Sequence, residues 1–145
     1  MNLCDVNVWL ALVLSKHVHH RRARAWLHTI RGQRAVLFCR STQQSLLRLL
    51  TNPSVLKPYG NRPLTNAEAW AVYEGFMADD RIALRIDEPE ELEPHWKTFG
   101  SRDTASPKRC MDAYLAAFAV AAGLRLVTTD TVFRDFPGLN LTLLK

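Results

Sequence analysis

Residues 3–14, LCDVNVWLALVL, are almost entirely apolar, yet they carry a carboxylate at Asp5 and an amide at Asn7. The stretch predicts a short buried strand over residues 2–5, followed by a helix over 7–15. Burying a carboxylate without a partner is costly, because the charge loses its hydration. Asp5 therefore needs a compensating group, and a lysine, backbone amides or a bound cation would each serve.

The segments after this stretch alternate between strand and helix patterns. Such alternation predicts an α/β fold in which a mostly parallel sheet is covered by helices on both faces. The Pro-, Gly- and Asn-rich segment 51–66 is predicted as a loop within a single domain spanning residues 1–145. Further strands are expected over 34–39, 81–86, 124–130 and 139–144, and further helices over 19–31, from Ser41 or Thr42 to Leu50, from the capping box TNAE (65–68) to about Ala78, over 89–99 and over 106–123.

Composition narrows the class of protein. A chain of 145 residues with 48% hydrophobic content can build a core, and its net charge of +5 favours polyanionic partners. Cys4, Cys39 and Cys110 lie far apart and form no CxxC motif, so they predict neither a disulfide framework nor a zinc knuckle. The chain shows no secretory signal pattern and no apolar run of about 20 residues. We therefore expect a cytoplasmic protein with no membrane attachment.

Three aspartates occupy positions from which they can converge. Asp5 ends the first strand, Asp130 ends the strand over 124–130, and Asp112 lies in the second turn of the helix over 106–123. Asp112 borders an apolar stripe expected to be buried, made of Met111, Leu115, Phe118, Ala119 and Ala122. Each aspartate also has a purely structural interpretation. Asp5 could be compensated by a lysine or by backbone amides, Asp112 could be a partly solvated helix acid, and Asp130 could cap a turn.

Taken together, the three carboxylates favour a metal site. Oxygen ligands from several segments suit a hard cation, Mg²⁺ or Mn²⁺. Such a cation would compensate the buried charge of Asp5 and support hydrolysis of a phosphodiester.

Five segments in the same order resemble the PIN-domain ribonucleases, and within them the VapC toxins of type II toxin–antitoxin pairs. The likeness runs over about residues 3–140. It implies a three-layer α/β/α sandwich with a mostly parallel sheet, Mg²⁺-dependent endoribonuclease activity on RNA, inhibition by a small cognate antitoxin protein, and a homodimer. The segments are Asp-x-Asn at the first strand, HVHHRRARAWL, STQQSLLRLLTNP, MDAYLAAFA and LVTTDTVF.

The resemblance assigns roles to individual residues. Asp5, Asp112 and Asp130 match the family's acids, which implies that they are catalytic and bind the metal. Asn7 and Thr128 match positions that support the acidic cluster by hydrogen bonds. The family commonly places a glutamate on the helix STQQSLLRLL, where this chain has a serine, Ser45. The sequence therefore does not decide whether the site binds one metal ion or two.

Basic residues beside the acids are candidates for substrate binding. Lys108 and Arg109 precede Asp112 at a helix N-terminus, where anions bind readily, and both are predicted to contact substrate phosphates. A zinc site at the histidines of HVHH is disfavoured, because no cysteine or HExxH pattern accompanies them.

Two other functions are alternatives to the ribonuclease. The missing glutamate is consistent with a non-catalytic PIN-like module that binds RNA or a partner protein. A phosphatase with Asp5 as nucleophile is disfavoured, because that chemistry needs a second acid two residues further on, where Asn7 stands.

Overall fold

The computed structural model describes all residues from 1 to 145. Five strands form one sheet in the order β3-β2-β1-β4-β5, and every neighbouring pair is parallel. This confirms the parallel sheet predicted from the sequence. The strands are β1 (Asn2–Cys4), β2 (Val36–Cys39), β3 (Ile82–Arg85), β4 (Arg125–Thr128) and β5 (Asn140–Leu143).

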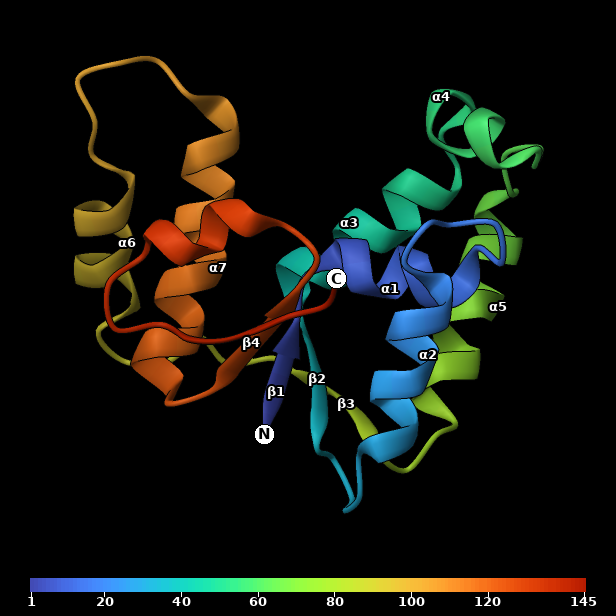
Figure 1. The fold of residues 1–145 in the computed structure, drawn as a ribbon, viewed down its shortest axis with the longest axis horizontal. Helices are drawn as coiled ribbons and strands as arrows, with labels where there is room; N and C mark the ends of the chain where they lie inside the picture. The colour runs from blue at the N-terminus through green and yellow to red at the C-terminus, as the bar shows by residue number, and fades with distance from the viewer.

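Helices cover both faces of this sheet, which gives three α/β/α layers (Figure 1). No helix combines the length and the hydropathy needed to cross a lipid bilayer. One face carries α1 (Val6–Val13), α2 (His20–Thr29), α3 (Arg40–Leu50), α4 (Pro53–Leu56), the short 3₁₀ turn η1 (Lys57–Tyr59) and α5 (Asn66–Met77); the other carries α6 (Leu92–Gly100), α7 (Pro107–Ala122) and the 3₁₀ turn η2 (Thr131–Asp135).

Each face of the sheet has its own hydrophobic core, because successive strand residues point to opposite sides. In β2, Phe38 points toward α1, where its ring stacks on Trp9 with centroids 3.7 Å apart. The neighbouring Leu37 belongs to the opposite core, together with Phe118 of α7. Burial on both faces explains why β2, VLFC, is a continuous apolar run.

Several helix boundaries follow from local signals in the sequence. The Thr65 hydroxyl accepts the Glu68 amide at 3.1 Å, and the Glu68 carboxylate accepts the Thr65 amide at 3.0 Å, which confirms the capping box. Ser106 accepts the Arg109 amide and caps α7. At its other end α7 stops at Gly123, whose φ of 65° lies in the left-handed region that favours glycine.

Two boundary predictions need correction. The third helix begins at Arg40 with Cys39 at the N-cap position, so the expected cap at Ser41 or Thr42 was wrong. The chain turns from β2 directly into α3, and the Thr42 hydroxyl reaches back to accept the Cys39 amide at 3.0 Å. The segment 51–66, predicted as loop, contains α4, where Asn52 accepts the Ser54 amide at 2.9 Å.

The predicted buried stripe of α7 also needs correction at Met111, a residue that is 54% exposed. The first two turns of α7 extend past the carboxyl edge of the sheet, so Met111 has no strand to pack against and lines a surface cleft instead (Figure 1). The buried face begins at Ala113 and includes Leu115 and Phe118.

Candidate active site

A cleft of about 320 Å³ opens at the carboxyl edge of the sheet, beside the central strand β1. The sheet grows from β1 toward β2 and β3 on one side, and toward β4 and β5 on the other. Connections that diverge from such a switch point leave a crevice at the carboxyl edge. The polar lining comprises Asp5, Asp112, Asp130, Asn7, Ser41, Thr42, Ser45, Arg48 and Lys108.

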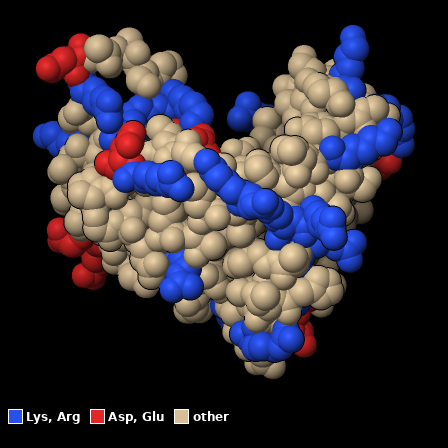
Figure 2. All heavy atoms as spheres, viewed as in Figure 1, with Lys and Arg blue, Asp and Glu red and all other residues tan.

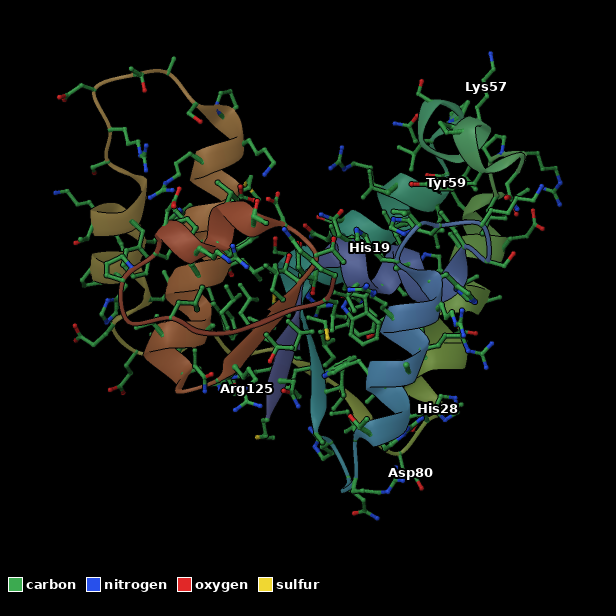
Figure 3. The ribbon with its side chains drawn as sticks, viewed as in Figure 1. His19, His28, Lys57, Tyr59, Asp80 and Arg125 are labelled. Atoms are coloured by element: carbon green, nitrogen blue, oxygen red, sulfur yellow. The ribbon has the colours of Figure 1, made fainter.

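The cleft lies far from the amino edge of the sheet, which Asp80 and Arg125 mark in Figure 3. Figure 2 shows a notch between the side carrying α6 and α7 and the side carrying α4, with Lys and Arg side chains on both of its flanks. A basic rim around an acidic floor suits a polyanion that must approach carboxylates.

Asp5 directly follows β1 and is held by the end of the neighbouring strand β4. Its amide donates to the Val127 carbonyl of β4 at 2.9 Å, and its carboxylate accepts the Thr128 hydroxyl at 2.7 Å. The residue is only 8% exposed. Burial raises the pKa of Asp5 to about 6; the Thr128 bond opposes this rise, and the charges of Asp112 and Asp130 add to it. Asp5 is thus a buried carboxylate without a cationic partner.

Asp112 and Asp130 meet at the ammonium of Lys108. The Lys108 Nζ lies 2.8 Å from Asp112 Oδ2 and 2.7 Å from Asp130 Oδ2. Burial disfavours the ionised form of Asp130, but the bonds from Lys108 and from the Val132 amide outweigh it and lower the pKa of that carboxyl. Asp130 also caps η2, so this residue both caps a turn and lines the cleft.

The two predicted supporting residues behave differently. Thr128 links two of the acids, because its hydroxyl donates to Asp5 and accepts the Asp130 amide at 3.1 Å. Asn7 lines the cleft from the first turn of α1, but its amide makes no hydrogen bond to the carboxylates.

The opposite wall of the cleft comes from α3. Ser45 and Arg48 both line it, so the serine at the family's glutamate position does face the acids' cleft. Arg109 lies elsewhere: its guanidinium donates to the Phe99 carbonyl and rests 4.1 Å from the centroid of the Phe136 ring. Of the two predicted phosphate contacts, only Lys108 reaches the cleft.

The bridge made by Lys108 is the feature that sequence reasoning missed. Its spacing of four residues from Asp112 was a usable signal, since residues at i and i+4 face each other on a helix. The link to Asp130, 22 residues away, had no such local signal.

The donor chemistry of the cleft fits a hard divalent cation. All three acids offer oxygen, Asp5 lacks a positive partner, and an ammonium already stands between the other two. No group of three His, Cys, Asp or Glu side chains is arranged to hold a metal ion. This applies to the three aspartates, two of which bind the Lys108 ammonium, and to the histidines before α2. There, His17 stacks on Tyr59, beside His19 (Figure 3).

Fold and cleft together define an α/β protein that gathers carboxylates at the switch point of a parallel sheet. The family model of the PIN domain matches residues 3–139, and the chain belongs to the PIN domain family.

A curated relative agrees with this membership, and two solved structures share the fold. The chain is 59% identical over 144 residues to Ribonuclease VapC41 of Mycobacterium tuberculosis, covering 99% of both chains. Its fold is similar to that of M. tuberculosis VapC20, described as a Sarcin-Ricin loop cleaving toxin (TM-score 0.63, 15% identity, 97% of this chain and 99% of that one). It is also similar to a chain in a toxin–antitoxin complex from Klebsiella pneumoniae (TM-score 0.59, 16% identity, 100% and 98% coverage).

Proposed function

We propose that this chain is the toxic endoribonuclease of a type II toxin–antitoxin pair, hydrolysing RNA phosphodiester bonds until a cognate antitoxin inhibits it. The observation that carries the proposal is the set of three carboxylates lining one cleft in a chain that is 59% identical to Ribonuclease VapC41. The net charge of +5 supports an anionic substrate. The three cysteines are free, as is usual in the reducing cytoplasm, where we place the protein.

Divalent-metal dependence is a general property of PIN-domain VapC ribonucleases. We propose Mg²⁺ as the metal here, with Mn²⁺ as a substitute, held by Asp5, Asp112 and Asp130. When bound, such an ion polarises a phosphate oxygen and makes a water more acidic.

The chain's own residues prepare the cleft for this chemistry. Thr128 fixes the orientation of the Asp5 carboxylate, and the Val132 amide holds one oxygen of Asp130. Arg48 lines the opposite wall, and we propose that it binds a phosphate of the RNA backbone. The low exposure of Asp5 limits competition from bulk water for its oxygens.

The antitoxin is proposed to act on the same acidic cleft. An arginine from the antitoxin would suit it, because a guanidinium fork binds carboxylates through paired hydrogen bonds. A homodimer is proposed by resemblance to related toxins, and size-exclusion chromatography with light scattering would measure it.

Removal of the metal is expected to stop RNA cleavage. The purified chain should cleave a labelled RNA in Mg²⁺, lose that activity in EDTA, and regain it when excess Mg²⁺ or Mn²⁺ is restored. Ca²⁺ serves as a control ion, since its larger coordination shell fits the reaction poorly. Binding of RNA without cleavage under all conditions would favour the non-catalytic module.

Restoring the family's acid is expected to strengthen metal binding. Ser45→Glu adds a fourth carboxylate to the cleft, and its charge should tighten Mn²⁺ binding about tenfold by calorimetric titration. Ser54→Glu on the exposed surface of α4 is the matched control and should leave the affinity unchanged. Equal affinities for the two variants would mean that position 45 does not face the ion.

A further inference from the structure

We propose that the Lys108 ammonium is a built-in second cation of this site, so that the chain binds one divalent ion instead of two. The inference rests on the proposed metal-dependent function and concerns what replaces a second metal in a cleft that lacks the family's glutamate.

The position of the ammonium is defined by two carboxylates. Lys108 lies in the first turn of α7, which Ser106 caps, so its spacing from Asp112 places Nζ over that carboxylate at 2.8 Å. The Val132 amide occupies Oδ1 of Asp130 at 3.0 Å, which leaves Oδ2 for Lys108 at 2.7 Å. The ammonium thus joins acids from two separate elements.

The charges of the three aspartates and of the lysine bound to two of them balance with one divalent ion. Three ionised carboxylates carry three negative charges, and the ammonium neutralises one, leaving the two that a single divalent ion compensates. A glutamate in place of Ser45 would add a fourth negative charge and leave room for more cation. Arg48 lines the far wall, and the ion pairs of Asp112 and Asp130 are made by Lys108 alone.

The hydrogen-bond partners of the three aspartates indicate separate positions for the Lys108 ammonium and the divalent ion. Asp5 receives only the neutral Thr128 hydroxyl, whereas both Asp112 and Asp130 already receive the ammonium. The uncompensated charge therefore lies on the Asp5 side of the cleft. Lys108 is a positioning residue in this account: it holds Asp112 and Asp130 together and keeps a second divalent ion from the space between them.

The test counts bound ions directly. Mn²⁺ is titrated into the full-length chain, and free Mn²⁺ is measured by electron paramagnetic resonance. We expect one ion per chain for the wild type and two for Lys108→Met, because the space between Asp112 and Asp130 then opens. Lys108→Arg keeps the charge and should keep one ion. Lys97→Met removes an exposed lysine of α6 and should also bind one.

Circular dichroism and thermal melting establish that each variant is folded, and Lys108→Gln replaces Lys108→Met if the latter does not fold. Two ions in the wild type, or one ion in both neutral variants, would overturn the role of Lys108. The wild type is assayed for RNA cleavage in parallel. If the wild type cleaves RNA and Lys108→Met still binds one ion, only the lysine proposal is refuted. If the wild type does not cleave RNA and does not bind Mn²⁺, the proposed function is refuted as well.

Discussion

Replacing Asp5 with asparagine is expected to reduce Mg²⁺-dependent RNA cleavage by at least about a thousandfold. Asparagine keeps the size of the side chain and an oxygen that accepts the Thr128 hydroxyl, so the fold is preserved. It removes the one carboxylate of the cleft that has no cationic partner. Weakened metal binding would remove several kcal/mol of transition-state stabilisation, and about 1.4 kcal/mol corresponds to each tenfold in rate.

Initial rates on a fluorescent RNA, measured on proteins purified in parallel, check this expectation. Asp103→Asn is the matched control, because Asp103 is an exposed acid in the segment before α7 and should retain the wild-type rate. Asp112→Asn should resemble Asp5→Asn. If Asp5→Asn cleaves within about tenfold of the wild type at saturating Mg²⁺, Asp5 is not part of the active site.

The same substitution is expected to stabilise the metal-free protein at neutral pH, by up to about 3 kcal/mol. Burial raises the pKa of Asp5 to about 6, against 3.8 for an ordinary aspartate. Between these values the folded chain binds more protons than the unfolded chain, so the free energy of unfolding falls as pH rises. The full difference of about two pH units corresponds to about 3 kcal/mol, lost progressively from pH 4 to pH 7.

Urea denaturation in EDTA at pH 4.5 and pH 7.5 measures this effect as the difference between Asp5→Asn and the wild type. Taking the difference cancels carboxyls with lowered pKa values, such as Asp79 and Asp130, whose contributions to stability change with pH in the opposite direction. The variant should gain on the wild type as pH rises, and Mn²⁺ should stabilise only the wild type at pH 7.5. A difference that does not change with pH would show that Asp5 is not a strained buried carboxylate.

These two expectations describe one trade-off. The carboxylate that the proposed chemistry needs is the one that burial destabilises, and a bound cation relieves that cost. In the absence of metal, stability therefore favours a neutral side chain at position 5, whereas activity requires the carboxylate. Such a conflict is common at functional sites.

Local signals in the sequence predicted the elements well. The capping box of Thr65 and Glu68 starts α5 as expected, and α7 begins after Ser106 and ends at Gly123 as expected. Capping hydrogen bonds and left-handed glycine conformations can be predicted because they involve only residues a few positions apart. The errors at Thr42 and Met111 arose where the surroundings override local preference. Thr42 caps from within the helix because β2 runs directly into α3. Met111 is exposed because the first turns of α7 extend beyond the carboxyl edge of the sheet.

For this protein, the sequence by itself determined the strands, the helices, the parallel sheet and the three aspartates, since these follow from periodicity, caps and residue type. Only the tertiary structure decided that Asp112 and Asp130 share the Lys108 ammonium while Arg109 turns away to Phe99 and Phe136. The sharing depends on where β4 ends and where α7 begins relative to each other. The relative position of β4 and α7 is set by packing between segments far apart in the chain, and no local pattern of residues encodes it.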